Sequence, residues 1–442
     1  MDYDLGFQKN FKKKQQALSA NMRYSSGVSE SVMDIVEIYE LLNYAPDNSK
    51  GLLQKSNDKQ SQNNFIASVD YAHPTVGGEN GKMETGYKTE IRKTDLDYDV
   101  QEFDDSSDVW YNLINVSNRF VYEESVHAGY VTYSNKIKRF SYLAGIRAEQ
   151  TGIASKLIET NVAYRKNYLN FFPSIHLSQE LAKENKIQLS YSRRIKRPRD
   201  RDINPFNSYA DALNLWVGNP DLNPELTHSY EIGHLKYWES AVLGSSIYYR
   251  HTDSVIQRIR RIDTNGISIA TPENFSTGDE FGVELTFSKD LFKWWKINGS
   301  LNYFRSIVDG GNLGNYSSNA YSYTGKINST AVLWKDIQLQ VMFNYRGPQE
   351  TIQGLRKEMY FMDVGLKKDL LSKRASLMLK FGDVFNSKKH RMEFYGDNFV
   401  INTEYRRSTS NIVLSFTYKV NSYKPKERNK MEGDYNMDDM GM

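Results

Sequence analysis

The stretch from Phe281 to Ser288 reads Phe-Gly-Val-Glu-Leu-Thr-Phe-Ser. One parity of this stretch carries Phe, Val, Leu and Phe, and the other carries Gly, Glu, Thr and Ser. Successive side chains of a β-strand point to opposite faces of the sheet. The alternation therefore predicts a strand with one apolar face and one polar face.

The same period of two residues continues along most of the chain and predicts an all-β fold. The apolar members of other alternating segments are Phe140, Tyr142, Ala144 and Ile146; Ile187, Leu189 and Tyr191; Ile337, Leu339, Val341, Phe343 and Tyr345; and Ile412, Leu414, Phe416, Tyr418 and Val420. Helical spacing is scarce, and only the stretch from Ser31 to Leu42 leaves helix and strand both open.

The connections between these segments alternate in length. The short ones fall at 134–136, 182–185, 238–240, 290–293, 335–336 and 372–373, and the long polar ones at 94–117, 151–166, 199–225, 263–278, 309–320, 347–358 and 387–408. Short turns at one end of the strands and long loops at the other are typical of an outer-membrane β-barrel and not of a soluble sandwich. Counting hairpins gives roughly seventeen antiparallel strands, the last of which, near Asn411 to Val420, runs toward the periplasm.

The composition agrees with a protein whose apolar side chains face lipid. Aromatic residues are 13% of the 442 residues, while all hydrophobic residues are only 39% and the mean hydropathy is −0.65. A soluble core of this size needs more apolar residues, and no apolar run reaches the ~18 residues of a transmembrane helix. Four tryptophans lie beside short turns and predict an interfacial belt, with ordinary strand aromatics as the alternative: Trp238, Trp294, Trp295 and Trp334.

Charge, cysteine content and the start of the chain limit partners and compartment. The net charge of +3 gives no field that would attract nucleic acid, so no nucleic-acid partner is predicted. The absence of cysteine excludes a disulfide framework, a thiolate metal site and a cysteine nucleophile. The opening residues, Met1-Asp2-Tyr3-Asp4, lack the features of a signal peptide, so we expect either a cytoplasmic chain or a missing natural N-terminus.

A bacterial single-chain barrel has an even number of strands, whereas the hairpins here give an odd number. Either upstream strands are absent, or the count is wrong by one.

Six stretches, taken in order, carry a family resemblance that is strongest from Phe120 to Val420. They are Gly145-Ile146-Arg147-Ala148-Glu149, Phe172-Pro173-Ser174, Leu189-Ser190-Tyr191-Ser192-Arg193-Arg194, Asn204-Pro205-Phe206, Gly218-Asn219-Pro220-Asp221-Leu222-Asn223-Pro224-Glu225 and Asp383-Val384-Phe385-Asn386. In this order they resemble the barrel of TonB-dependent outer-membrane receptors, within the outer-membrane β-barrel family of Gram-negative bacteria.

The resemblance implies an outer-membrane barrel of about twenty-two strands, plugged by an N-terminal globular domain. It implies energy-coupled uptake of a bulky nutrient, such as an iron chelate, cobalamin, a glycan or a peptide. The implied partners are outer-membrane lipid and lipopolysaccharide, a plug domain with an energy-coupling protein, and a surface lipoprotein. A structural or adhesive barrel without transport is the alternative.

No plug-like segment precedes Met1, so we expect a partial, C-terminal barrel portion without the plug, holding roughly seventeen of about twenty-two strands. Residues 1–420 are assigned to this barrel portion with long extracellular loops. Residues 421–442 carry mixed charge with nothing to bury, and we expect a disordered periplasmic tail there.

The long connection from Arg199 to Glu225 is the predicted ligand-binding loop, because it combines basic side chains with aromatic ones that can stack on a ligand. The candidate ligand-binding residues are Arg194, Lys196, Arg199, Arg201, Phe206, Tyr209 and Trp216. Two alternatives stay open. The basic residues can pair with carboxylates inside the barrel, or the loop can fold inward and pack on a plug.

No pattern for catalysis, a cofactor or a metal stands out, so we expect neither an enzyme nor a metal site. Asp95, Asp97 and Asp99 alternate as in a calcium loop, but Val100 and Ser106 stand where an EF-hand needs Gly and Glu. A weak calcium loop there remains the alternative to a solvated acidic loop. The seven histidines lack metal-ligand spacing, and no nucleophile elbow or phosphate-binding glycine loop occurs.

Overall fold

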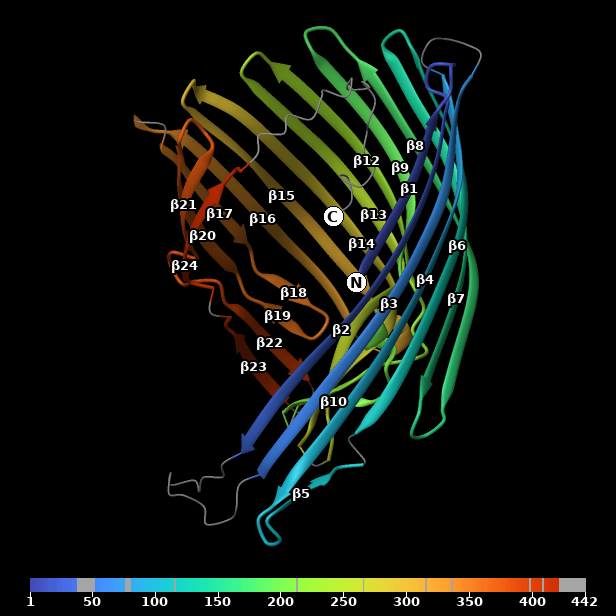
Figure 1. The fold of residues 1–442 in the computed structure, drawn as a ribbon, viewed down its shortest axis with the longest axis vertical. Coiled ribbons are helices and arrows are strands. Elements are labelled where there is room, and N and C mark those ends of the chain that lie inside the picture. The colour runs from blue at the N-terminus through green and yellow to red at the C-terminus, as the bar shows by residue number, and fades with distance from the viewer. Residues whose placement is uncertain are drawn as a thin grey trace.

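The computed structural model describes residues 1–37, 52–75, 81–114, 117–211, 214–264, 266–314, 316–334, 337–396, 399–407 and 409–420. Within these ranges the chain forms long antiparallel strands joined into one curved wall (Figure 1). None of the helices in the described ranges has the length and apolar character needed to cross a membrane. The predicted tail at 421–442 lies outside the described residues.

Seventeen strands of the described chain form the wall, and each pairs antiparallel with the next. In pairing order they are β1 (Asp2–Asn10), β2 (Ala17–Glu37), β3 (Leu52–Pro74), β4 (Lys82–Asp104), β6 (Asn118–Ile137), β7 (Phe140–Leu157), β8 (Ala163–Glu180), β9 (Asn185–Lys196), β12 (Glu225–Trp238), β13 (Ala241–Ile262), β14 (Ser268–Phe292), β15 (Trp295–Asp309), β16 (Ser317–Val332), β17 (Ile337–Arg346), β20 (Met359–Leu370), β21 (Ala375–Gly382) and β24 (Asn411–Tyr418). The predicted all-β class is confirmed, and the wall has the number of strands that the hairpins suggested. Among the described residues no pairing joins β1 to β24, so these two strands are the edges of the wall.

Shorter elements occupy the connections at one end of the wall. They are β5 (Val109–Asn112), α1 (Asp200–Ile203), β10 (Asn207–Asp211), β11 (Asn214–Val217), η1 (Gly311–Leu313), β18 (Gln349–Thr351), β19 (Gly354–Arg356), β22 (His390–Gly396) and β23 (Phe399–Tyr405). The last four form a separate four-stranded sheet, called the loop sheet below. The connections at 347–358 and 387–408 are therefore not simply polar loops, because they pair with each other through β19 and β22.

The two faces of the wall follow the predicted alternation. On β7, Ile146 is exposed on the outer face, whereas Glu149 and Thr151 are buried on the inner face. On the outer face a row of aromatic rings, formed by Tyr191, Tyr230, Tyr249 and Phe281, crosses β9, β12, β13 and β14 with successive centroids 5.0, 6.1 and 4.6 Å apart. The apolar parity thus lines the surface that faces lipid in an outer-membrane barrel.

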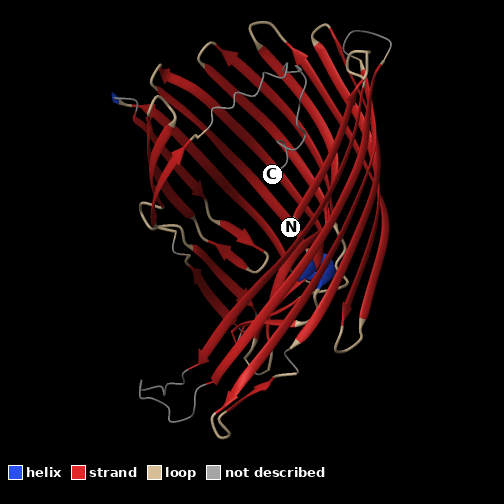
Figure 2. Cartoon of the chain, viewed as in Figure 1, coloured by secondary structure: helices blue, strands red, loops and turns tan. Residues whose placement is uncertain are grey.

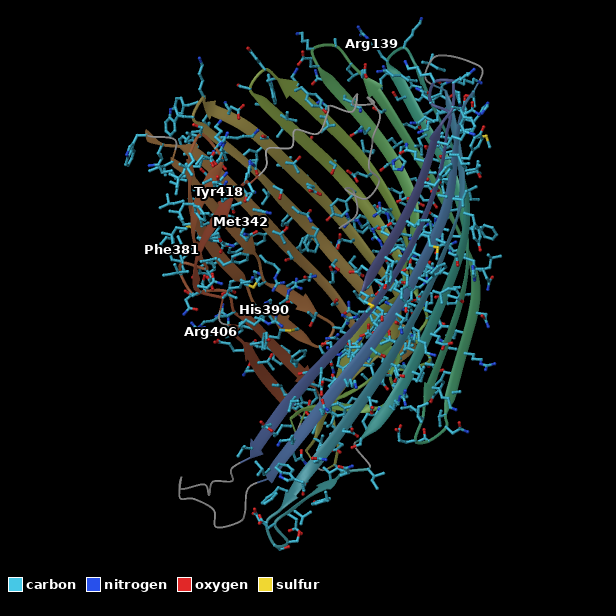
Figure 3. All side chains as sticks on the ribbon, viewed as in Figure 1. Arg139, Met342, Phe381, His390, Arg406 and Tyr418 are labelled. Carbon is cyan, nitrogen blue, oxygen red and sulfur yellow. The ribbon has the colours of Figure 1, made fainter. Side chains whose placement is uncertain are left out.

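The predicted tryptophan positions lie at the short-turn end of the wall, which is the upper end in Figure 2. Arg139, in the short turn between β6 and β7, marks this end in Figure 3. Trp294 lies in the turn that joins β14 to β15. Its ring forms a cluster with those of Phe292 and Trp295, with centroids 5.6 and 5.8 Å from its own and 6.3 Å from each other. Such rings combine an apolar body with an N–H group and are suited to the membrane boundary.

Several strands extend further than the sequence suggested. The chain from Ser31 to Glu37, where helix and strand were both open, belongs to β2, and residues 38–42 lie outside the described part. β4 continues through Asp104 and β14 spans 25 residues, although about 9–11 residues suffice to cross a bilayer. Backbone pairing needs no apolar side chains, so the hairpins continue past the point where the apolar alternation ends.

Candidate functional site

The described residues of the connection from β9 to β12, 197–211 and 214–224, are called the inner segment below and lie against the inner face of the wall. Within them, β11 pairs in parallel with the start of β14, where Asn214 lies opposite Ser268 and Trp216 opposite Ala270. Figure 2 shows α1 inside the curve of the sheet, toward the end opposite the short turns. The longest predicted loop is therefore folded onto the barrel interior.

A close backbone contact shapes the inner segment. The N–H of Gly218 donates to the carbonyl oxygen of Asn204 at 2.9 Å, and the N–H of Asn219 donates to that of Asp202 at 2.7 Å. A Cβ atom on residue 218 would lie only 2.4 Å from the Asn204 oxygen, so this position requires glycine. Two of the stretches that carry the family resemblance thus contact each other directly.

Apolar side chains anchor the inner segment to the wall. Ile203 and Leu222 are buried in one cluster with three wall residues, Phe120, Tyr122 and Leu157, and Phe206 packs against this cluster. Fully burying a side chain of this size contributes about 1.5–3 kcal/mol. These contacts hold the segment at the end of the wall that carries the long connections.

Polar contacts fix the end of the inner segment in the same place. The Nζ of Lys166, on β8, donates to the carbonyl oxygens of Asp221 and Leu222 at 2.6 and 2.9 Å. The Nδ2 of Asn274 donates to the carbonyl oxygen of Asn223 at 3.0 Å, and the N–H of Asn223 donates back to Asn274 Oδ1 at 2.7 Å. The turn before β12 is therefore held from both sides.

Arg199 is paired within the segment. Its Nε and Nη2 donate to the two carboxylate oxygens of Asp202 at 3.0 and 3.1 Å. Asp202 is 7% exposed. Burial alone would raise the pKa of this carboxyl group, but the hydrogen bonds and the charge of Arg199 hold the pKa below its usual value.

Two arginine side chains place their guanidinium groups over the ring of Trp216. The guanidinium carbon atoms of Arg201 and Arg258 lie 4.7 and 4.1 Å from the ring centroid. The Nε1 of Trp216 donates to the carbonyl oxygen of Arg201 at 3.3 Å. Cation–π contacts of this kind are worth about 0.5–2 kcal/mol and keep the guanidinium edges available for an acceptor.

Two more predicted residues lie beside the segment on β9, on the inner parity. The Nζ of Lys196 lies 2.9 Å from Glu225 Oε2, and the side chain of Lys196 is 70% exposed. Glu225 also accepts a hydrogen bond from the N–H of Ile256 at 2.8 Å. Arg194 is exposed, and no carboxylate in the described residues forms an ion pair with it.

A row of alternating charges lines the wall next to the segment. Arg92 pairs with Glu124 at 2.8 Å, and Glu149 pairs with Arg197 at 2.5 Å and with Arg147 at 2.6 Å. These five side chains, with Lys88, Glu90 and Val126, line a cavity of about 230 Å³. The sequence did not reveal this row. Charged residues that alternate along one strand show that they share a face, but not which residues of other strands lie opposite them.

A second cavity of about 240 Å³ lies on the inner face, at residues from β15, β16, β17 and β20. It is lined by Ser300, Thr324, Gly325, Lys326, Asn344, Tyr345, Arg346, Met359 and Phe361. The cations Lys326 and Arg346 were also missed by sequence analysis. Their only signal was that both take the polar parity of their strands.

The structure brings most of the predicted ligand-binding residues together. Arg199, Arg201, Phe206 and Trp216 belong to the inner segment, while Arg194 and Lys196 lie on the adjoining strand. The side chain of Tyr209 lies outside the described part, and its backbone pairs with Leu215. The inward folding that the sequence left open is present, with the wall as the contact surface. Ligand binding by these residues stays a prediction.

The acidic stretch from Asp95 to Asp99 is part of the wall. Asp95 lies on β4 and pairs with Arg119 at 2.7 Å. In the ranges that the structure describes, no three His, Asp or Glu side chains are grouped so that they could hold a metal ion.

The sequence matches the Outer membrane protein beta-barrel family over residues 9–418. No curated protein matches it. Among solved structures it is similar to the copper transporter OprC, with 13% identity, a TM-score of 0.61, and coverage of 91% of this chain and 63% of that one.

Two further solved structures have the same fold. The ferric yersiniabactin uptake receptor FyuA from Yersinia pestis has 12% identity and a TM-score of 0.59, with coverage of 94% of this chain and 60% of that one. The ferric-catecholate import receptor Fiu from K12 E. coli has 11% identity and a TM-score of 0.61, with coverage of 88% and 60%. The chain thus spans about three fifths of the length of these structures.

Proposed function

We propose, from the premise that this chain belongs to the outer membrane protein beta-barrel family, that it forms the barrel of a receptor for energy-coupled uptake of a bulky nutrient. The chain is an all-β protein of the Gram-negative cell outer membrane. The nutrient classes proposed are an iron chelate, cobalamin, a glycan or a peptide. A copper transporter and two ferric-chelate receptors share the fold, which makes uptake the first activity to test.

The observation that carries this proposal is the inner segment. A surface-display barrel has no need to fold one of its longest connections into its own interior. There the segment presents cations and an aromatic ring to the lumen. The side chains of Lys196 and Arg199 are exposed there, and the guanidinium groups of Arg201 and Arg258 lie over the ring of Trp216. Such a surface can stack on a ligand and neutralise it.

The proposed binding residues are Arg194, Lys196, Arg199, Arg201, Phe206, Tyr209 and Trp216. Phe206 takes a supporting role, because it packs against the buried cluster that positions the segment. Arg194 has no ion pair within the described chain and is the cation most available to a ligand. We propose no catalytic activity.

The proposed partners follow from energy-coupled uptake. They are a plug domain and a TonB-type energy-coupling protein, with outer-membrane lipid and lipopolysaccharide on the apolar outer face and a surface lipoprotein at the loop end. The alternative function is a structural or adhesive barrel without transport.

Uptake by a strain that lacks the complete gene tests this proposal, with a plasmid copy as the restoring control. Labelled ferric chelates, cobalamin, oligosaccharides and peptides are supplied one class at a time, with and without a protonophore. Energy-coupled import of one class should require both the gene and an energised membrane. Normal uptake of every class in the deletion strain would contradict the proposal and favour the structural barrel.

A further inference from the structure

The cations around the second cavity lack the partners that other charges of this chain have. Lys326 and Arg346 line the cavity, and neither forms an ion pair with a carboxylate in the described residues. By contrast, Asp363 on the neighbouring strand is already paired with Lys380 at 3.1 Å. Arg346 is half-buried, whereas Lys326 is exposed. Half-buried cations are normally paired, so the lack of an ion pair at Arg346 needs an explanation.

Unsatisfied hydrogen-bond donors gather at the same place. The Nδ2 of Asn344, the Nε of Arg346 and the Nε of Arg356 are buried and donate to no acceptor, while the Nη2 of Arg356 donates to Gln349 Oε1. Asn344 and Arg346 belong to β17, and Arg356 ends β19 in the loop sheet. Leaving a buried donor without an acceptor costs about 1–3 kcal/mol, and more for a charged group.

One face of the loop sheet adds a cation, Arg356, without any acidic residue beside it. Strand register puts Arg356 and Met392 opposite each other, and His390 opposite Tyr405. Arg356 and His390 therefore share a face, because opposite partners and alternate residues lie on the same side of a sheet. This face carries no acidic residue in β18, β19, β22 or β23.

On the opposite face of the loop sheet, the cations are paired with carboxylates. Lys357 pairs with Glu393, Arg391 with Glu358 at 2.8 Å, and Lys389, beside β22, with Glu404 at 3.5 Å. The lack of carboxylates on the first face is thus not a general property of the loop sheet.

The pKa values of Arg356 and His390 are both lowered by the charge of Arg346. Burial lowers the pKa of the Arg356 guanidinium, and the charge of Arg346 lowers it further. Burial likewise lowers the pKa of His390, and Arg346 and Lys388 lower it further. Both groups lie in connections outside the wall strands, and Figure 3 labels His390 on the loop sheet.

Lys388 completes the group at the edge of the cavity. Its Nζ lies 4.6 Å from the ring centroid of Phe361, which lines the cavity. The cavity volume of about 240 Å³ exceeds the ~30 Å³ share of a single water molecule several-fold. It can therefore hold a group of several heavy atoms.

We propose that Lys326, Arg346 and Arg356 form a binding site for a carboxylate or phosphate group of the imported ligand. The inference rests on the proposed uptake function and narrows its substrate class to anionic compounds. Asn344 donates to the same oxyanion through Nδ2, Lys388 supplies positive charge at its edge, and His390 lies beside these cations. An acidic side chain from another part of the receptor is the competing source of the same chemistry.

The test uses the complete receptor in detergent with succinate and inorganic phosphate as probes and uncharged succinamide as the control ligand. The readout is the NMR titration of His390, identified by its loss in His390→Asn. Bound oxyanion should raise the pKa of His390, because it offsets the repulsion from the neighbouring cations. Arg346→Gln and Arg356→Gln should each weaken probe binding about tenfold or more.

Lys357→Gln is the matched control, because it removes one cation next to Arg356 from the opposite, paired face. It should leave probe binding unchanged. Absence of any probe effect on the wild-type protein, or equal binding by all variants, would overturn the site. A lower melting temperature of Arg346→Gln without any probe effect would also overturn it and assign the cations to an internal carboxylate.

Two further outcomes distinguish failure of the anion site from failure of the proposed uptake function. Uptake that persists at full rate in Arg346→Gln and Arg356→Gln, for the substrate identified above, refutes the anion site and leaves the uptake function standing. Probe binding that depends on both arginines, in a receptor that imports nothing, supports the site and refutes uptake.

Discussion

The N–H of Gly218 donates to the carbonyl oxygen of Asn204 at 2.9 Å, across a gap too narrow for any side chain at position 218. This contact joins the inner segment to the end of α1, two residues after Trp216. The arrangement predicts that the segment can be loosened without disturbing the wall, because the wall strands β9, β12 and β13 pair with one another independently of it.

Gly218→Ala should loosen the inner segment while the barrel still inserts. The added Cβ would meet backbone atoms of Asn204 at 2.4–2.9 Å, and backbone atoms cannot swing aside as a flexible side chain can. Limited proteolysis of outer-membrane fragments should show faster cleavage within 197–224. Gly129→Ala is the control, since nothing lies within 4 Å of its Cβ position. Equal protease resistance of the two variants would contradict the role of this contact.

Charge should be tolerated on one parity of β14 and not on the other. Leu285 is on the exposed outer parity, and its neighbour Thr286 is on the inner one. Leu285→Arg should cost roughly 2–4 kcal/mol near the middle of the bilayer, and Thr286→Arg much less. The free energy of unfolding of each variant in lipid vesicles, measured by urea titration, tests this. Equal losses on both parities would show that the assignment of faces is wrong.

Deleting Ser208 to Leu215 should abolish uptake while membrane insertion stays normal. The deletion removes most of the β10–β11 hairpin and the parallel contact of β11 with β14. The wall around it keeps its own pairing, so the barrel should fold. Uptake and the amount of protein in the outer membrane are measured together. Unchanged uptake, or failure to insert, would refute binding by the inner segment.

Asp383 should make the connection after β21 sensitive to acid. It is 2% exposed and accepts hydrogen bonds from the N–H groups of Ser387 and Lys388, at 3.0 and 3.1 Å, and from Thr409 Oγ1 at 2.6 Å. Burial would raise the pKa of Asp383, but these hydrogen bonds hold it below its usual value. The stabilisation is therefore present above the unfolded pKa of about 4 and is lost as the pH falls through the folded value.

Asp383→Asn should remove about 1–3 kcal/mol of local stability at neutral pH and abolish this acid sensitivity. Hydrogen exchange of residues 383–389 between pH 3 and pH 7, corrected for intrinsic rates, measures both effects. Glu350→Gln, an exposed change in the loop sheet, serves as the control. Unaltered exchange in the Asp383 variant would show that this carboxylate does not hold the turn.

The sequence by itself determined the wall. The alternation at Phe281 to Ser288 and its repeats specify strands and their faces, because a shift of one residue would move every apolar side chain to the wrong solvent. The alternation of short and long connections gave the number of wall strands and the end at which the long loops lie. These properties depend on local period and on neighbours in sequence, which a single chain displays directly.

Only the tertiary structure decided what the long connections do. Nothing in the sequence says that Gly218 lies on Asn204, that β11 pairs in parallel with a strand more than fifty residues away, or that Arg356 and Arg346 act on each other electrostatically. The connections lack a regular apolar period, so their positions depend on contacts between residues far apart in sequence. Such contacts exist only after the wall has curved and brought its strands to face one interior.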